Sequence, residues 1–340
     1  MRAMVLHGPG ALAELPLREQ DVAVPQPGPG EVGIEISACG VCRTDLQLVQ
    51  GDLGLRRRPL IPGHQIVGHV CAVGAGVDQQ LVGTRVGVAW NAGTCGTCRQ
   101  CRHDRENLCQ HGTFTGWDRD GGYASYTVAD AAFTYPLPAA FDDLAAAPLL
   151  CGGVIGYRSL RVAEVQPGSR LGLFGFGASA TQVIQIATSW GCDVFVCTRS
   201  SGEQARAEAL GAIWAGGYDD TLPAPLDAAI TFAPSGDVVV AALRAVDRGG
   251  IVAINAIHLD RIPQFPYELL WWERQLRSVA NVTRRDALEF LDLAASIPLR
   301  TVTEPFPLEQ ANEALRRLDQ GHISGAAVLV VDPAQAPGSR

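Results

Sequence analysis

Four cysteines stand within fifteen residues of this chain, at positions 95, 98, 101 and 109. Four soft thiolates so close together suit a closed tetrahedral zinc site, which leaves no position open for chemistry. The alternatives are an iron–sulfur cluster, which four cysteines also ligate, and four buried cysteines that bind no metal. We predict a structural zinc site here.

A second set of metal-binding residue types is spread over the chain: Cys42, His64 and Cys151. Two thiolates and one imidazole leave the fourth position of zinc for water or substrate, which is the pattern of catalytic sites. Each residue also has an ordinary explanation, because Cys151 could be a small core residue and His64 a turn histidine. Cys39 lies near this set but is expected to be a small buried residue outside it.

A glycine-rich turn predicts a dinucleotide site. Gly175, Gly177 and Ala180 form a G-x-G-x-x-A pattern between an expected strand, 170–174, and an expected helix that begins at Ala178. The first glycine permits the tight turn, and the second lets the backbone approach a pyrophosphate at the helix N-terminus. The alternative is a glycine-rich turn that binds no ligand.

The end of the next expected strand bears on the choice of cofactor. NAD enzymes usually carry an acidic residue there, whereas this chain has Thr198, Arg199 and Ser200. An arginine and two hydroxyls can bind a 2′-phosphate, so the sequence favours NADP(H) over NAD(H). A solvated surface arginine is the alternative, and Glu203 just downstream counts against NADP(H).

Composition places the chain among ordinary globular proteins. Its 340 residues suggest about two domains, and it is 47% hydrophobic and 18% charged with a net charge of −8. We therefore expect neither a nucleic-acid nor a membrane partner. The N-terminus has no apolar signal segment, so a cytoplasmic location is predicted, where clustered cysteines bind metal rather than form disulfides.

The order of predicted elements indicates an α/β protein with two domains. A β-rich domain comprises residues 1–150 and 285–340, and a parallel-sheet domain comprises 151–284. In the first, short apolar runs predict strands at 33–37, 66–73, 85–89 and 123–128. In the second, helices and apolar strands alternate: helix 153–162, strand 170–174, helix 178–190, strand 194–198, helix 203–210, strand 226–232, helix 237–246 and strand 250–255. The tail reads helix 284–295, helix 310–320 and strand 326–331.

Seven motifs in order resemble the zinc-dependent medium-chain alcohol dehydrogenase family over essentially the whole chain. They are C-G-V-C-R-T-D, P-G-H-x-x-x-G, V-G-x-R-V-G-V, C-x-x-C-x-x-C with N-L-C, D-G-G-Y-A-x-Y, P-L-L-C-G-G and G-F-G-x-x-A. The resemblance implies a GroES-like β-rich catalytic domain and a Rossmann domain with a doubly wound parallel sheet. It also implies two zinc ions per subunit and a homodimer or homotetramer.

The resemblance assigns roles to individual residues. Cys42, His64 and Cys151 resemble the catalytic zinc ligands, and the other four cysteines resemble the structural ones. Thr44 resembles the hydroxyl that relays the alcohol proton, Asp45 the carboxylate that orients the histidine, and Arg43 a contact to the cofactor pyrophosphate. Trp90 stands where the family lines its substrate pocket, and an aromatic core residue is the alternative.

Two positions depart from the family pattern. Gln65, which we group with the catalytic zinc residues, stands where the family usually has glutamate, so the zinc environment loses a negative charge. Gln47 stands where many relatives have a histidine that completes proton transfer, and a neutral amide does not titrate near pH 7. Both departures bear on rate rather than on reaction type.

The resulting expectation is reversible hydride transfer between a small alcohol or aldehyde and NAD(P). A polyol dehydrogenase of the same superfamily is one alternative, although its relatives often replace the third cysteine ligand with a carboxylate. A catalytically silent protein that binds zinc and nucleotide is the other. Trp90 and Trp117 favour slender primary alcohols and aldehydes as substrates.

Overall fold

The computed structural model describes residues 1–256, 259 and 261–331. Residues 332–340, which we assigned to the first domain, lie outside this range. The chain divides into two compact units. The first contains Met1–Cys151, Thr283–Ala295 and the chain from Arg300 onward, and the second contains Gly152–Val282 and Ser296–Leu299. Each unit is described by itself.

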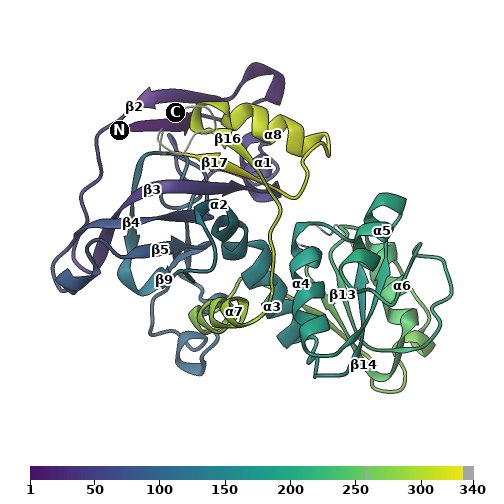
Figure 1. The fold of residues 1–340 in the computed structure, drawn as a ribbon. Helices are drawn as coiled ribbons and strands as arrows, with labels where there is room; N and C mark the ends of the chain where they lie inside the picture. Colours follow the sequence, from purple (N-terminus) through teal and green to yellow (C-terminus); the bar gives the residue numbers. More distant parts are fainter. Residues whose placement is uncertain (257–258, 260, 332–340) are drawn as a thin grey trace. The chain divides into compact units, whose positions relative to one another are not determined.

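The first unit is built on a seven-stranded sheet in the order β16-β17-β3-β4-β5-β9, with β8 also paired to β3 (Figure 1). All neighbours pair antiparallel except β16 and β17, which run parallel. The strands are β3 (Glu31–Val41), β4 (Ile66–Val73), β5 (Arg85–Val88), β8 (Tyr126–Asp130), β9 (Thr134–Pro136), β16 (Thr303–Pro307) and β17 (Ala326–Val330). Two small sheets pair β1 (Arg2–Leu6) with β2 (Leu17–Asp21) and β6 (Asn91–Gly93) with β7 (Thr113–Phe114).

Alternation of apolar residues explains why β3 forms the centre of this sheet. Val32, Ile34 and Ile36 are buried on one face, against a core that includes Ile66 and Val70 of β4. The helices of this unit are α1 (Arg43–Gln50), α2 (Asp143–Ala146), α7 (Arg284–Ser296) and α8 (Ala311–Asp319). Short 3-10 helices lie between them: η1 (Leu12–Glu14), η2 (Gln79–Leu81), η3 (Cys101–His103), η4 (Glu106–Leu108), η5 (Ala131–Phe133), η6 (Ala147–Leu150) and η8 (Leu308–Gln310).

The second unit contains a six-stranded sheet in the order β12-β11-β10-β13-β14-β15, and every neighbouring pair is parallel. Its strands are β10 (Arg170–Phe174), β11 (Asp193–Cys197), β12 (Trp214–Gly216), β13 (Leu226–Thr231), β14 (Val246–Ile254) and β15 (Gln275–Ser278). The order reverses between β10 and β13, which is the switch point of a doubly wound Rossmann sheet. The predicted α/β class with a parallel sheet is confirmed.

Helices cover this sheet, as alternating βα units require. They are α3 (Gly152–Val162), α4 (Ala178–Ser189), α5 (Ser201–Ala209) and α6 (Gly236–Ala245), and η7 (Tyr267–Leu269) is a 3-10 helix. Helix α6 contacts β13 and β14, and α4 contacts β10 and β11. Strands 66–73 and 170–174 match their predictions, and most other predicted elements differ by a few residues at their ends. The elements that were not predicted are helices α1 and α2 and strands β1, β2, β6, β7, β9, β12, β15 and β16.

Among the described residues, no helix combines the length and the apolar character that a membrane crossing requires.

Candidate active site and metal centres

Cys42, His64 and Cys151, far apart in sequence, come together inside the first unit. Their ligand atoms all lie within 4.8 Å of one another. Cys42 Sγ is 3.4 Å from His64 Nε2, close to the separation of about 3.6 Å that one tetrahedral zinc ion imposes on a sulfur and a nitrogen ligand. The site therefore has the donor atoms and the spacing that a zinc ion needs.

The N-terminus of α1 holds Cys42 in place. Cys42 is the N-cap residue, and its sulfur accepts a hydrogen bond from the Thr44 backbone N–H at 3.4 Å. The Asp45 side chain accepts a hydrogen bond from the Cys42 N–H at 2.9 Å, which completes a capping box. The thiolate thus lies at the positive end of a helix, where negative charge is stabilised.

Asp45 also orients His64. Its Oδ1 lies 3.3 Å from His64 Nδ1, and both side chains are almost fully buried. Because the carboxylate faces Nδ1, the other ring nitrogen, Nε2, is turned toward Cys42. This is the arrangement in which a buried carboxylate fixes the tautomer of a metal-binding histidine.

The turn before His64 depends on glycine. Gly63 has a φ of +97°, and a Cβ there would lie 2.4 Å from the ring of Tyr123. Only glycine avoids both the left-handed strain and this clash. The P-G-H motif thus delivers the imidazole from a turn that the buried Tyr123 constrains.

Cys42 and Cys151 are linked by a hydrogen bond that affects the ionisation of both. A hydrogen bond from the Cys151 thiol holds the pKa of Cys42 well below its usual value. The same hydrogen bond, together with burial, raises the pKa of Cys151 well above its usual value. A metal ion bound by Cys42 and Cys151 would hold both sulfurs as thiolates.

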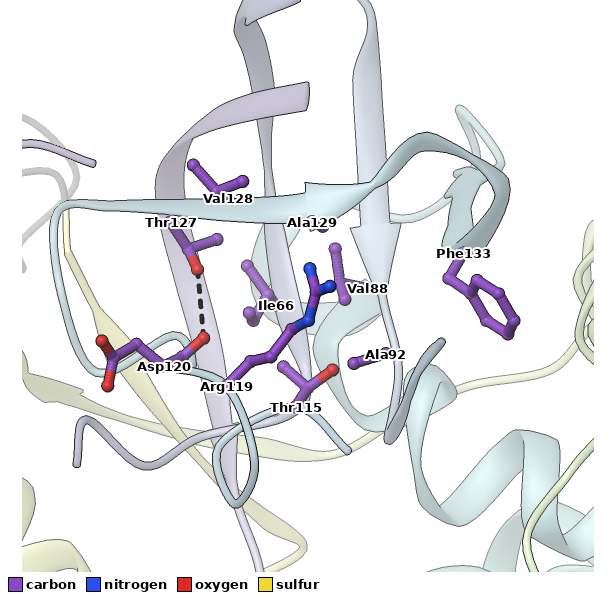
Figure 2. A pocket seen from close by; sticks show the side chains of 10 residues that line it. All are labelled: Ile66, Val88, Ala92, Thr115, Arg119, Asp120, Thr127, Val128, Ala129 and Phe133. Carbon is purple, nitrogen blue, oxygen red and sulfur yellow. Dashed lines mark hydrogen bonds between the residues drawn. The ribbon is translucent and has the colours of Figure 1, made fainter. Parts of the chain in front are cut away.

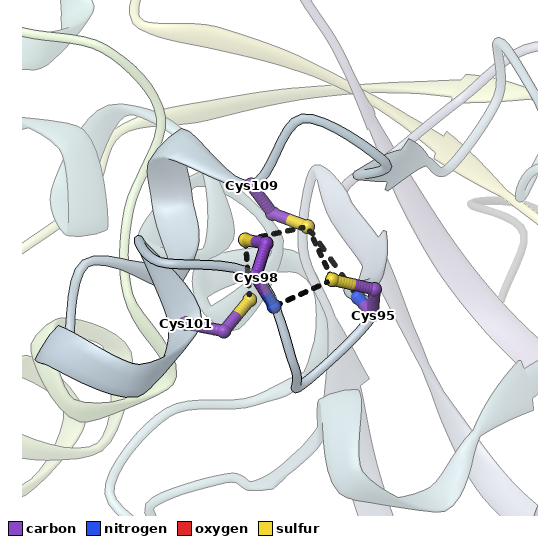
Figure 3. A group of neighbouring side chains, drawn as sticks. All are labelled: Cys95, Cys98, Cys101 and Cys109. Atoms are coloured by element: carbon purple, nitrogen blue, oxygen red, sulfur yellow. Dashed lines mark hydrogen bonds between the residues drawn. The ribbon is translucent and has the colours of Figure 1, made fainter.

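Cys95, Cys98, Cys101 and Cys109 converge on a second centre (Figure 3). The Sγ–Sγ distances are 3.5 Å between Cys98 and Cys101, 3.9 Å between Cys98 and Cys109, and 3.5 Å between Cys109 and Cys95. Sulfurs around a tetrahedral zinc ion lie about 3.8 Å apart, whereas a disulfide would bring them to about 2.05 Å. All ten cysteines of the chain are free.

The loop around these four cysteines affects their ionisation in opposite directions. Hydrogen bonds from the backbone N–H groups of Thr97 and Cys98 lower the pKa of Cys95 to about 6. Burial and the neighbouring sulfurs raise the pKa of Cys101 to about 12. Four crowded thiols cannot all ionise without a cation, so this arrangement also fits a bound metal ion.

The remaining predicted residues of this unit lie on α1 or beside it. Arg43 is exposed at the start of the helix, and Thr44 is half-buried. Gln47 and Gln65 are both buried. A Cβ on Gly40 would lie 2.6 Å from Gln65 Oε1, so Gly40 leaves the space that this amide occupies.

The glycine-rich turn of the second unit has the geometry of a phosphate cradle. Gly175 has a φ of +91°, and a Cβ there would lie 2.8 Å from the backbone nitrogen of Ala233. Gly177 is the N-cap residue of α4, and a Cβ there would meet nothing within 4 Å. The first N–H groups of α4, from Ala178 to Ala180, thus lie beside a space that a pyrophosphate can fill.

Of the three predicted cofactor residues at the end of β11, two form hydrogen bonds to Glu203 and the third is exposed. The Thr198 hydroxyl donates a hydrogen bond to the Glu203 carboxylate, and Ser200 Oγ accepts one from the Glu203 N–H at 3.3 Å. Both hydroxyls that we predicted to contact the cofactor are therefore engaged at the N-terminus of α5. Arg199 is exposed and forms no ion pair with the residues that the structure describes.

Arg199 lines a cavity of about 570 Å³ at the carboxyl ends of the strands. Tyr218, Ser235 and Arg244 are among the other residues around it. Ligands of open parallel sheets bind at this edge. The cavity is large enough for a nucleoside with its phosphate.

Three aromatic rings gather beside His64. Trp90 meets the imidazole edge-on, with ring centroids 5.1 Å apart, and stacks on Phe114 at 5.1 Å and on Trp117 at 5.8 Å. We call Trp90, Phe114 and Trp117 the aromatic cluster. All three are only partly buried and lie outside the unit's hydrophobic core. Sequence reasoning singled out Trp90 and Trp117 but missed Phe114, for which periodicity gave no signal.

A further cavity, which lies in the first unit, is too small for a substrate. It measures about 10 Å³ and lies among Ile66, Val88, Arg119 and their neighbours, where Thr127 donates a hydrogen bond to the Asp120 carbonyl at 3.3 Å (Figure 2). Such a volume holds about one water molecule. This cavity is therefore no candidate for the substrate pocket, which Trp90 was predicted to line.

Comparison with known proteins agrees with this geometry. Residues 28–139 match the family described as the alcohol dehydrogenase GroES-like domain. The chain is 48% identical to a probable alcohol dehydrogenase, AdhA, of Mycobacterium tuberculosis (strain CDC 1551 / Oshkosh), over 97% of both chains. It is 34% identical to an alcohol dehydrogenase of Geobacillus stearothermophilus, over 92% of this chain and 95% of that one. A cobalt- and zinc-bound thermostable alcohol dehydrogenase from Pyrobaculum aerophilum has a TM-score of 0.87 and 25% identity, over 97% of this chain and 99% of that one.

Proposed function

The chain belongs to the zinc-type medium-chain alcohol dehydrogenase family, and on this premise we propose which of its residues perform the reaction. The activity is that of an NAD(P)-dependent oxidoreductase that interconverts alcohols and aldehydes. We propose that Cys42, His64 and Cys151 hold a catalytic zinc ion, and that the four clustered cysteines hold a structural one. The convergence of the three distant ligand atoms within 4.8 Å carries this proposal.

The chain's own residues orient the zinc ligands and transfer the substrate proton. When bound, zinc would supply Lewis-acid polarisation of the substrate oxygen, and the nicotinamide would supply the hydride donor or acceptor. Asp45 keeps His64 Nε2 turned toward the cysteines. Thr44, half-buried on the first turn of α1, relays the proton of the substrate hydroxyl. Because Gln47 is a neutral amide, it cannot accept this proton, which passes from Thr44 to water instead.

For the cofactor, we propose that NADP(H) is favoured over NAD(H). Arg199 supports this choice, since its guanidinium forms no ion pair with the described residues and lines the cavity at the end of β11. Arg244 adds a second cation to the same cavity. Glu203, the next acidic residue along the chain, accepts a hydrogen bond from Thr198. Asp219 and Asp237 line the same cavity and oppose part of this positive charge.

We also propose a homodimer or homotetramer that forms through β15, the edge strand of the second unit. Edge strands carry unpaired backbone groups that can pair with another chain. Tyr267, Trp271 and Trp272, just before this strand, are 67%, 51% and 49% exposed. A cytoplasmic location stays a prediction from the sequence.

Replacement of one ligand tests the metal assignment. We expect Cys42→Ala to bind one zinc ion per chain instead of two and to lose at least about a thousandfold in turnover of primary alcohols, because the Lewis acid is absent. Zinc content by mass spectrometry and NAD(P)H absorbance measure these effects, and circular dichroism checks the fold.

Cys39→Ala is the matched control. Cys39 is a fully buried cysteine on β3, three residues before the partly buried Cys42, and it lies outside the ligand group. It should keep both zinc ions and most of the activity. Wild-type turnover in a Cys42→Ala protein that has lost one zinc ion would disprove the assignment, as would two retained zinc ions.

A further inference from the structure

An arginine outside the metal site stacks on the aromatic cluster. The guanidinium carbon of Arg56 lies 3.6 Å from the centroid of Trp117 and 5.8 Å from that of Phe114. The first distance is short even for a cation–π contact, which extends to about 6 Å. Arg56 belongs to neither the metal ligands nor the cofactor residues.

A carboxylate and a backbone carbonyl fix this contact. Arg56 Nη1 is 3.2 Å from both oxygens of Asp118, and Asp118 Oδ2 also accepts a hydrogen bond from the Phe114 N–H at 2.9 Å. Trp117 Nε1 donates to the Gly54 carbonyl at 2.8 Å. Segment 54–56, which follows α1, is thereby tied to the turn 114–118.

The contacts continue from Arg56 to the metal site without a gap. Arg56 lies on Trp117, Trp117 stacks on Trp90, and Trp90 meets His64 edge-on. The planes of Trp90 and Trp117 are inclined by only 22°. Arg56 is therefore the outermost member of a stack whose innermost ring lies against a proposed zinc ligand.

We infer that Arg56 is a positioning residue that sets substrate selectivity by holding Trp117 and Trp90 beside the catalytic metal site. This inference rests on the proposed function, because it needs the substrate to meet the aromatic cluster. We expect the fixed indole edge to favour slender primary alcohols over branched ones. Without the contact to Arg56, Trp117 and Trp90 can change position, and the enzyme discriminates less between unbranched and branched alcohols.

Arg56→Ala, Arg56→Lys and Arg57→Ala form the test set. Arg57 is a matched control, since it is an equally exposed arginine that pairs with Asp120 at 2.9 Å and contacts none of the three rings. The measurements are kcat and KM for an unbranched and an α-branched alcohol, and the circular dichroism couplet of the stacked indoles. The second readout does not depend on activity.

For Arg56→Ala we expect the preference for the unbranched alcohol, as a ratio of kcat/KM values, to fall about fivefold. Most of the change should appear in KM for the unbranched alcohol, with a weaker indole couplet. Arg56→Lys should recover part of the preference, because it keeps a cation over Trp117, and Arg57→Ala should match wild type.

The outcomes distinguish the positioning role of Arg56 from the proposed function of the protein as an alcohol dehydrogenase. An active wild-type enzyme whose selectivity is the same in Arg56→Ala, or changes equally in Arg57→Ala, overturns the role of Arg56 and leaves the proposed function intact. A zinc-loaded wild type that turns over no alcohol overturns the proposed function itself. In that case the indole couplet still reports whether Arg56 orders the stack.

Discussion

At the scale of single residues, the proposed preference for NADP(H) depends on Arg199. It is the one member of the Thr198-Arg199-Ser200 segment whose polar group is not engaged at the N-terminus of α5. A charge-assisted hydrogen bond to phosphate contributes about 1.5–3 kcal/mol. We therefore expect Arg199→Ala to lower kcat/KM for NADPH by about tenfold or more.

NADH is the internal control for this prediction, because it lacks the 2′-phosphate. Its kcat/KM should change by less than about threefold in Arg199→Ala. Steady-state kinetics of both cofactors with one aldehyde measure the ratio. A wild type that prefers NADH would contradict the cofactor assignment, whatever the variant does.

Residue types with fixed chemistry were predictable, and residues defined by their neighbours were not. The spacing of the cysteines and the P-G-H turn indicated both metal sets, because few other functions need those side chains. The role of Arg56 depends on Asp118 and Trp117, which the fold brings to it from more than 60 positions away. The engagement of Thr198 and Ser200 likewise depends on where Glu203 returns on α5.

At the scale of elements, α7 anchors the loop that carries the clustered cysteines. Its first residue, Arg284, holds Glu106 of η4 through its backbone N–H and its guanidinium, at 2.6 to 3.0 Å. Thr283 and Asp286 form a reciprocal capping pair at the same helix end. The cysteine loop is therefore fixed to a helix nearly two hundred residues later in the chain.

Loss of the Glu106–Arg284 contact is expected to lower the free energy of unfolding, by an amount that depends on pH. Burial alone would raise the pKa of the Glu106 carboxyl, but the hydrogen bonds from Arg284 hold it below its usual value. The stabilisation is thus present at pH values above the usual glutamate pKa of about 4.3, and is lost as the pH falls through the lowered pKa. We expect Glu106→Gln to lower the free energy of unfolding of the zinc-loaded protein by roughly 1–3 kcal/mol.

Urea denaturation over a pH series measures this effect. The deficit of Glu106→Gln should be constant from pH 8 down to about 6, since the carboxyl stays ionised there. Glu313→Gln removes a similar pair with Arg316 on the exposed surface of α8, and it should cost at most about 0.5 kcal/mol. Equal deficits for the two variants would show that α7 does not anchor the loop.

Elements with strong periodicity were predicted, whereas those defined by pairing or capping were missed. The apolar strands 66–73 and 170–174 needed no tertiary information. Helix α1 was missed because its cap is a cysteine, yet Asp45 three residues later and the buried Leu46 and Val49 carry the signal of a capping box. Strand β15 was missed because its sequence is polar and it pairs only with β14.

At the scale of the whole molecule, the change from β-rich to alternating sequence predicted two domains with a returning tail. The expected boundaries at 150/151 and 284/285 lie one and two residues from those at 151/152 and 282/283. Ser296–Leu299, which joins the second unit, was not predicted, because such a short excursion leaves no pattern in composition. The family and the α/β class are confirmed, and the site assignments and the oligomeric state stay predictions.

Substitutions at the proposed interface test the oligomeric state. Tyr267, Trp271 and Trp272 are exposed aromatic residues in the segment before β15, which is the edge strand of the sheet in the described part of the chain. Exposed apolar residues that cluster often mark a contact surface. We expect the wild type to have the mass of two or four chains by size exclusion with light scattering. The double variant Trp271→Glu with Trp272→Glu should have a lower mass, because charge at the centre of the contact opposes association.

Ile213→Glu controls for added charge, since Ile213 is 59% exposed in the same unit but precedes β12, at the opposite edge of the sheet. It should keep the wild-type mass. Because the three proposed zinc ligands all lie in the first unit, dissociation of the tryptophan variant should leave its zinc content the same as that of the wild type. A wild type with the mass of one chain would exclude the interface, as would a tryptophan variant with unchanged mass.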